Sequence, residues 1–278
     1  MTIAAALARA TERLEAAGIV GAGHDARILL AEALRVERMR LALEPERALS
    51  GAEQAMFNVL IARRLAREPV SRIVGRRLFW DRTFTITADV LDPRPETEVL
   101  ISEALEGAAP ARFLDLGTGS GIIAVSLLAE WPGARAVATD LSPAALEVAR
   151  VNAKAHGVAD RLTLMTSDWF AAVEGRFDLI VSNPPYIAAR ELALLAPEVR
   201  DHDPAMALTP GGDGFAAYHA ITKDAGAHLT PGGRLIVEIG ARQGNKVAAL
   251  FKRDGFGRVH LRQDFDRRDR VVSGIWRG

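Results

Sequence analysis

The residues best suited to chemistry are Asn183-Pro184-Pro185-Tyr186, which follow the apolar run 177–181 and Ser182. A short apolar run bounded by turn residues is typical of a buried parallel strand. Two successive prolines end such a strand, because each lacks a backbone donor and fixes φ. We therefore expect a rigid turn at the carboxyl end of a strand, where open α/β sheets bind their ligands. It presents a carboxamide, carbonyl groups and an aromatic ring.

A second motif, Gly117-Thr118-Gly119-Ser120-Gly121, follows the expected strand 112–116 and leads into a helix. Glycine permits positive φ and a close ligand approach, and a helix N-terminus adds free N–H groups. The spacing differs from the G-x-G-x-x-G dinucleotide fingerprint, with Ile at position 122. It predicts a site for a nucleoside without a pyrophosphate. The alternative is a glycine-rich connection that binds nothing.

Acidic and aromatic residues end the next two expected strands. Asp140 stands about 20 residues after the glycines, where a carboxylate accepts hydrogen bonds from ribose hydroxyls; its alternative role is to interact with the dipole of the helix that follows. Asp168 and Trp169 offer a carboxylate for an exocyclic amino group and an indole to stack on adenine. Trp169 is equally suited to anchor a core.

This set of strand ends resembles the class I S-adenosylmethionine-dependent methyltransferases. The resemblance implies a Rossmann-like fold of class α/β. The implied cofactor-binding residues are Gly117, Thr118, Gly119, Ser120, Gly121, Asp140, Asp168, Trp169 and Asn183.

The Asn-Pro-Pro-Tyr motif resembles that of members that methylate a planar nitrogen: the amino group of adenine or cytosine, or the amide of glutamine. Such a nitrogen is a weak nucleophile and must lie ~3–3.5 Å from the methyl group. We expect the Asn183 oxygen and the Pro184 carbonyl to accept its N–H groups and to stabilise the growing positive charge. Tyr186 would stack on the planar group as a third catalytic residue, and Pro185 would complete the substrate-binding turn. This chemistry requires no metal and no dedicated base.

The motifs depend on an alternation of strands and helices that begins near Arg112. We predict strands at 112–116, 135–139, 161–165, 177–182 and 234–239, and helices at 121–130, 143–156, 215–228 and 241–254. The alternation indicates a parallel sheet with helices on both faces. Strands 256–262 and 269–276 follow without a helix between them, so the last strand should run antiparallel.

Residues 1–75 have only helical patterns. Ser50 and Glu53 have capping-box spacing and open a long helix, whose expected apolar face is Met56, Phe57, Leu60, Ile61 and Leu65. The segment is either a bundle that stabilises its neighbour or a docking surface for a partner.

Residues 76–92 predict a β-hairpin linker. Phe84, Ile86, Ala88 and Val90 alternate with polar residues, and Asp81-Arg82 is the expected turn. Beyond the linker, residues 93–278 form the expected methyltransferase domain, in which Thr97 or a neighbour caps a helix from about Val99.

Composition limits the functional classes. Lys and Arg number 35 against 35 Asp and Glu, which disfavours direct nucleic-acid binding. There is no cysteine, which excludes disulfides and cysteine-type zinc sites. We expect a cytoplasmic protein without a signal peptide or membrane span.

More specific segments identify a narrower resemblance. They are EPVSRIVGRRLFW at 68–80, PRPETE at 93–98, DGF at 213–215, PGGRLIVEIG at 231–240 and the closing DRVV. With these the chain is similar, over essentially its full length, to the release-factor glutamine methyltransferases (the PrmC/HemK family). The resemblance implies a five-helix-type N-terminal domain that docks the release factor, a hairpin linker and a seven-stranded catalytic domain. The implied substrate is the glutamine in the GGQ loop of peptide-chain release factors.

The chain departs from the family pattern at two places. Asp203 stands where the family more often has Glu before Pro204, and Asp92 stands where an apolar residue usually precedes the PRPETE proline. Neither departure touches the Asn-Pro-Pro-Tyr chemistry. The rival function is a DNA adenine methyltransferase, which would flip its target base into the pocket and would be expected to carry a basic face.

Overall fold

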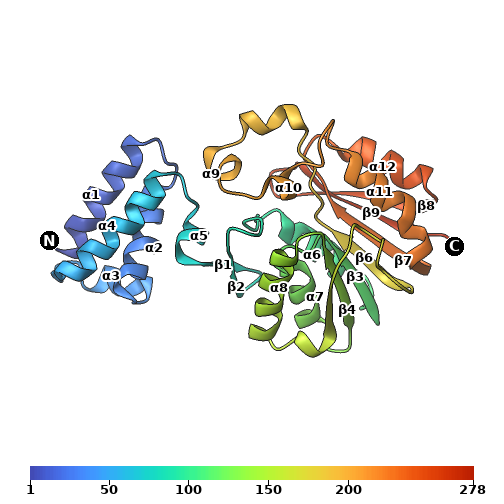
Figure 1. The fold of residues 1–278 in the computed structure, drawn as a ribbon, viewed down its shortest axis with the longest axis horizontal. Coiled ribbons are helices and arrows are strands. Elements are labelled where there is room, and N and C mark those ends of the chain that lie inside the picture. Colours follow the sequence, from blue (N-terminus) through green and yellow to red (C-terminus); the bar gives the residue numbers. More distant parts are fainter. The chain divides into compact units, whose positions relative to one another are not determined.

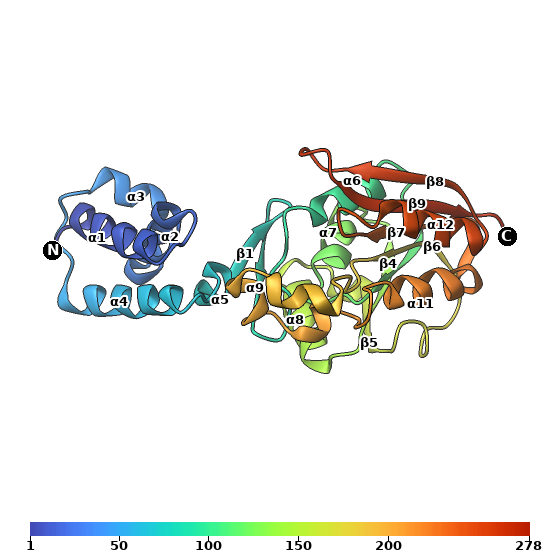
Figure 2. The same ribbon diagram turned by 90° about the horizontal axis from the view of Figure 1, so that it is seen from above.

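The computed structural model describes residues 1–278, which divide into two compact units. The first comprises Met1–Arg76 with Pro197–His202, and the second comprises Arg77–Ala196 with Asp203–Gly278. Figures 1 and 2 show the helices of the first unit and the sheet of the second. None of the helices is both long enough and apolar enough to cross a membrane.

The first unit is helical throughout. Its helices are α1 (Ile3–Ala16), α2 (Ala22–Leu34), α3 (Arg38–Leu43), α4 (Gly51–Leu65), α5 (Val70–Val74) and the short α9 (Pro197–Arg200). The five helices before residue 75 agree with the number that the family resemblance implies. One apolar core holds them together, with Leu14, Leu29, Leu30 and Phe57 among its fully buried side chains.

The predicted capping box at the start of α4 is confirmed. The Ser50 hydroxyl accepts a hydrogen bond from the Glu53 N–H at 3.2 Å, and the Glu53 carboxylate accepts one from the Ser50 N–H at 2.8 Å. Phe57 and Ile61 face the core as expected, but Met56 is 49% exposed. Its expected place in the core was wrong, because adjacent residues of an α-helix lie about 100° apart and Met56 falls outside the buried face.

The second unit is built on a seven-stranded sheet with the order β5-β4-β3-β6-β7-β9-β8. Its strands are β3 (Arg112–Leu116), β4 (Arg135–Asp140), β5 (Leu162–Thr166), β6 (Phe177–Ser182), β7 (Leu229–Glu238), β8 (Phe256–Gln263) and β9 (Asp269–Trp276). Strands β3 to β7 pair in parallel, whereas β9 runs antiparallel to both β7 and β8. The fold class and the antiparallel last strand are confirmed.

Helices cover both faces of this sheet (Figure 1). Helices α6 (Thr97–Leu105), α7 (Ile122–Glu130) and α8 (Pro143–Ala155) pack on the face that includes Phe113 and Leu179. Helices α11 (Ala216–Ala225) and α12 (Gly244–Arg253) pack on the face that includes Leu114 and Ile180. Successive strand residues therefore enter opposite cores, as the period of two requires. The remaining elements are η1 (Ala159–Arg161), η2 (Ala189–Leu194), α10 (Ala205–Leu208) and η3 (Gly226–His228).

The predicted hairpin is present, but its turn and the length of its alternating pattern differ from the prediction. Strands β1 (Arg76–Phe79) and β2 (Arg82–Thr85) are joined at Trp80-Asp81, where both residues have positive φ, at 48° and 55°. The expected turn at Asp81-Arg82 was wrong by one residue, because a two-residue turn with positive φ normally contains Asn or Gly and not Trp. The alternation also ends early: Ile86 is buried, but Ala88 is exposed.

Two helix and strand starts differ from expectation. Helix α6 begins at Thr97, and its N-cap residue Glu96 makes no side-chain cap hydrogen bond, so the predicted cap by Thr97 was wrong. Strand β7 begins at Leu229 instead of 234. The register between β6 and β7 shifts near this start. Strand β7 therefore includes Pro231-Gly232-Gly233 as an irregular segment, whereas we expected the strand to begin after these residues.

Candidate active site

The residues with a predicted catalytic or binding role lie together at one edge of the sheet. Strands β3 and β6 are neighbours, and the chain order reverses between them, because β4 and β5 lie on one side and β7 lies on the other. The carboxyl ends of strands at such a reversal are where open α/β folds hold their ligands. A cavity of about 440 Å³ lies there, within the size range of small-molecule sites.

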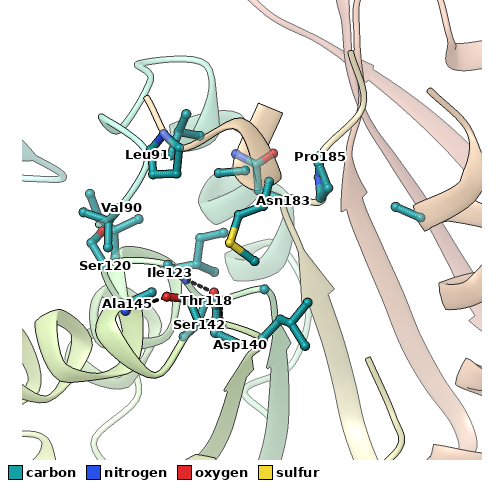
Figure 3. A pocket seen from close by; sticks show the side chains of 18 of the residues that line it. Val90, Leu91, Thr118, Ser120, Ile123, Asp140, Ser142, Ala145, Asn183 and Pro185 are labelled. Carbon is teal, nitrogen blue, oxygen red and sulfur yellow. Dashed lines mark hydrogen bonds between the residues drawn. The ribbon is translucent and has the colours of Figure 1, made fainter. Parts of the chain in front are cut away.

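Most of the predicted residues line this cavity (Figure 3). They are Gly117, Thr118, Gly119, Ser120, Asp140, Asp168, Trp169, Asn183 and Pro185. The predicted residues that do not line it are Gly121, Pro184 and Tyr186. Much of the remaining wall comes from segments that the sequence did not single out: the stretch after the hairpin, with Val90 and Leu91, and the region from Pro204 to Ala217.

The glycine loop is shaped for close approach. Gly117 and Gly119 have φ of 69° and 55°, and a Cβ at either position would meet no atom within 4 Å. Their space is therefore open to the cavity, and the positive φ requires glycine. Gly121 has a different role, because a Cβ there would come within 3.0 Å of the Ala149 side chain in α8. The third glycine lets α7 and α8 pack closely.

A buried carboxyl holds the loop from behind. Asp115 is fully buried, and its Oδ2 accepts hydrogen bonds from the Thr118 hydroxyl at 2.6 Å and from the Ala124 N–H at 3.3 Å. Burial raises the pKa of Asp115 to about 7; the charge of Asp140 adds to this rise, and the two hydrogen bonds oppose it. Asp115 thus fixes both the turn and the first turn of α7.

Asp140 both shapes the loop and faces the cavity. Its Oδ2 accepts from the Gly119 N–H at 2.8 Å, and its Oδ1 accepts from the Ser142 N–H at 2.9 Å. Figure 3 shows Asp140 next to Thr118 and Ser142 on the cavity wall. An ionised carboxylate has about four acceptor positions, so each oxygen retains capacity for one more donor. The contact with the Ser142 N–H places Asp140 at the start of α8, and ribose binding by the remaining acceptor positions stays a prediction.

Trp169 adopts a backbone conformation that is unusual for a large residue, with φ of 47°. The Ser167 hydroxyl stabilises it by donating to the Trp169 carbonyl at 2.9 Å and accepting from the Ala172 N–H at 3.0 Å. Such strain is maintained where the surroundings over-determine it, often at functional sites. Trp169 is half-buried against one core and also lines the cavity, whereas Asp168 is exposed.

The Asn-Pro-Pro-Tyr turn is fixed at both ends. Asn183 Nδ2 donates to the Thr97 hydroxyl at 3.2 Å. Tyr186 donates its hydroxyl to Glu238 Oε1 at 3.4 Å, and its backbone carbonyl accepts from Gln243 Nε2 at 2.9 Å. With Asn183 Nδ2 bound to Thr97, the Asn183 side-chain oxygen remains available as an acceptor on the cavity wall.

Known proteins resemble the chain along its whole length. Residues 5–75 match the family model described as PrmC N-terminal domain, and residues 87–214 match the model described as Methyltransferase small domain. The release factor glutamine methyltransferase of Cereibacter sphaeroides is 58% identical over 274 residues, which cover 98% of each chain. The chain belongs to the release factor glutamine methyltransferase family. The family member from Caulobacter vibrioides is 42% identical and covers 99% of this chain and 96% of its own.

Solved structures share the methyltransferase fold with this family member. The hMettl16 catalytic domain aligns with a TM-score of 0.57 at 17% identity, covering 70% of this chain and 74% of that one. A methyltransferase from Pyrococcus furiosus aligns with a TM-score of 0.53 at 17% identity, covering 70% and 89%. At this identity the likeness concerns the fold alone.

Sequence reasoning missed several residues that build the site of this family member. Asn152 in α8 is fully buried; its Nδ2 donates to the Ser120 carbonyl at 2.8 Å and its Oδ1 accepts from the Thr85 N–H at 2.7 Å. It thereby joins the glycine loop to strand β2. A lone Asn inside an amphipathic helix gives no sequence signal for this role, whereas Thr97 and Glu238 stand in the motifs PRPETE and PGGRLIVEIG.

Proposed function

We propose that the protein transfers a methyl group from S-adenosylmethionine to the side-chain amide nitrogen of the glutamine in the GGQ loop of peptide-chain release factors. The observation that carries this proposal is the placement of Asn183 on the cavity wall with its side-chain oxygen free, in a chain 58% identical to a release factor glutamine methyltransferase. We also propose that it acts in the cytoplasm, where release factors work on ribosomes.

The cavity suits S-adenosylmethionine. Gly117 and Gly119 leave a cradle that a Cβ would fill, Asp140 offers acceptors for ribose hydroxyls, and the half-buried Trp169 offers a ring face for adenine. Asp168 is exposed at the cavity wall, where its carboxylate can accept from the adenine amino group. When bound, S-adenosylmethionine supplies an electrophilic methyl group.

The residues of the turn supply orientation and charge stabilisation. Asn183 Oδ1 accepts one N–H of the substrate amide, and the Pro184 carbonyl accepts the other. These two hydrogen bonds direct the nitrogen lone pair at the methyl group and stabilise the positive charge that develops on nitrogen. Tyr186 is anchored on Glu238 and does not itself line the cavity; its proposed role is to cover the planar amide once the substrate has entered beside Asn183. The nitrogen then loses its proton to solvent, because the methylated cationic amide is strongly acidic.

The helical residues 1–75 are proposed to dock the release factor, with the hairpin 76–92 as the linker to the methyltransferase domain 93–278. Two features support docking over a purely stabilising role: residues 5–75 match a family-specific domain model, and α3 exposes apolar side chains. Met39 and Leu43, four residues apart on α3, are 75% and 74% exposed. Exposed apolar side chains on one helix face are typical of a partner surface.

Methyl transfer from labelled S-adenosylmethionine tests the function. We expect label on a purified full-length release factor, and none on the same factor with its loop glutamine replaced or on duplex DNA. Label on the replaced factor or on DNA would contradict the proposal. The second of these results would favour the alternative, a DNA adenine methyltransferase; at present the full-length relatives favour the release factor.

Asn183→Ala completes this test. Methyl transfer should be lost, while S-adenosylmethionine still binds in calorimetry. Asn245→Ala, at an exposed position of α12 outside the proposed docking domain, is the matched control and should retain full turnover. Near-normal turnover of the Asn183 variant would exclude the proposed role of Asn183.

A further inference from the structure

A buried carboxyl outside the cavity is hydrogen-bonded to a side chain of the site. Glu238 ends strand β7, is 1% exposed and does not line the cavity. Its Oε1 accepts from the Tyr186 hydroxyl at 3.4 Å. Burying a carboxyl is costly unless it is hydrogen-bonded, so such a group normally has a structural or functional reason.

The Thr97 hydroxyl stands between this carboxyl and Asn183. It accepts from Asn183 Nδ2 at 3.2 Å. Burial raises the pKa of Glu238 to about 7, and the Thr97 hydroxyl opposes this rise. A hydroxyl that lowers a carboxyl pKa donates its hydrogen to it. Thr97 and Glu238 do not meet the geometry of a normal hydrogen bond, since Glu238 Oε1 accepts from Tyr186 and Oε2 has no partner. Catalytic hydrogen bonds are often loose without substrate and tighten in the complex.

The direction of these contacts has a chemical consequence. A hydroxyl has one hydrogen, so a Thr97 hydroxyl that donates to Glu238 can only accept from Asn183. Asn183 must then present its Nδ2 to Thr97 and its oxygen to the cavity. The opposite rotamer would place an NH₂ group against the NH₂ group of a substrate amide, where neither can accept.

We propose that Thr97 and Glu238 are positioning residues, which fix the Asn183 carboxamide with its oxygen toward the substrate amide. The catalytic consequence of this positioning rests on the proposed function. The positioning also gives a shared role to the motif PRPETE, which contains Thr97, and the motif PGGRLIVEIG, which contains Glu238. The charged groups around Glu238 belong to the same assembly. Arg270, in the closing DRVV motif, pairs with Glu96 of PRPETE at 3.4 Å and with Asp264 at 2.8 Å.

Substitutions at Thr97 distinguish a role in positioning Asn183 from a role in stabilising the fold. Thr97→Val keeps the shape but removes the acceptor, and we expect kcat to fall about 10–100-fold, as for a misplaced reacting group. KM for the release factor and affinity for S-adenosylmethionine should change less than about threefold, because the contact acts in the transition state. Thr97→Ser should restore most of the rate. Thr222→Val, which removes another buried hydroxyl that donates to Asp254 at 2.6 Å, is the control and should leave kcat unchanged.

Glu238→Gln tests the direction of the contacts. Gln presents an NH₂ group that can donate to Thr97 and allow the carboxamide of Asn183 to reverse. We expect kcat to fall with no loss in Tm, because a buried carboxyl is replaced by a neutral group of the same size. A fall in Tm that accompanies unchanged kcat would show a purely structural role and overturn the proposal.

A readout independent of activity completes the test. The side-chain amide resonances of Asn183 in ¹⁵N-labelled protein, assigned by their loss in Asn183→Ala, should show one proton protected from exchange. That protection should disappear in Thr97→Val and persist in Thr97→Ser. If the wild type shows this pattern but methylates no release factor, the proposed function fails and the positioning stands. If Asn183 is equally exchangeable in wild type and Thr97→Val, the positioning fails whatever the activity.

Discussion

The Asp92 backbone N–H donates a hydrogen bond to Asp203 Oδ1 at 3.3 Å, so the two departures from the usual family pattern are in contact. The second oxygen of Asp203 accepts from Arg94 Nη2 at 2.7 Å, and its side chain is fully buried. Asp203 therefore holds the 92–94 stretch, of which Pro93 and Arg94 line the cavity.

Asp203→Asn should loosen this wall. The neutral amide weakens a charge-assisted hydrogen bond, which contributes about 1.5–3 kcal/mol when buried. We expect a lower Tm and weaker calorimetric binding of S-adenosylmethionine. Asp201→Asn, whose pair with Arg200 is exposed, is the control and should change neither. Unchanged cofactor affinity in the Asp203 variant would show that this contact does not shape the cavity.

Asp140→Asn should weaken cofactor binding more than it weakens the fold. Its oxygens accept from Gly119 and Ser142, and the remaining acceptor positions are those proposed for ribose. Replacing the Asp140 carboxylate by an amide removes one acceptor oxygen. The affinity for S-adenosylmethionine, measured by calorimetry, should therefore fall at least tenfold. Ser50→Ala is the comparison: it removes a helix cap away from the cavity, which accepts from the Glu53 N–H at 3.2 Å, and should cost about 1 kcal/mol of stability with little loss of affinity for S-adenosylmethionine. Equal losses of affinity in the two variants would argue against a ribose contact.

Gly121→Ala should destabilise the fold although Gly121 does not line the cavity. An added Cβ would approach the Ala149 side chain to 3.0 Å, and φ is 77°. Positive φ and overpacking together should cost about 2–4 kcal/mol in chemical denaturation. Gly133→Ala, where a Cβ meets nothing within 4 Å, should be nearly neutral. If both variants unfold at the same denaturant concentration, the close packing of α7 and α8 does not depend on this glycine.

The sequence predicted the sheet and most of the site because those features leave local signals. The runs at β3 and β6 and the Ser142 cap show as apolar patterns and turn residues, and their bounds agree with the structure. What was missed depends on contacts distant in sequence. Asn183 and Thr97 lie 86 residues apart, and Asn152 and Thr85 lie 67 apart. No periodicity records such pairs. The positive φ of Trp80 and Trp169 was equally hidden, because tertiary contacts and not residue preference stabilise it.

Docking through α3 predicts a selective change in KM. Met39→Gln combined with Leu43→Gln should raise KM for the release factor several-fold and leave affinity for S-adenosylmethionine unchanged, because both side chains are exposed in the helical unit. Val151→Gln, at an exposed position of α8 in the other unit, is the matched control. A KM equal to that of the wild type in the double variant would place the docking surface elsewhere.

The buried carboxyl of Asp115 should make the free energy of unfolding fall as pH rises. Burial raises its pKa from 3.8 to about 7, so between these values the folded state binds a proton that the unfolded state has lost. The free energy of unfolding therefore decreases across this window, by on the order of 4 kcal/mol for this group alone. The stabilisation is complete below about pH 4 and absent well above pH 7.

Asp115→Asn has no such proton, so its stability relative to the wild type should increase with pH when unfolding is measured in urea at pH 5, 6, 7 and 8. Glu238, whose pKa burial also raises to about 7, contributes equally in both proteins and cancels in the comparison. A difference in stability that does not change with pH would mean that Asp115 is already ionised in the folded protein.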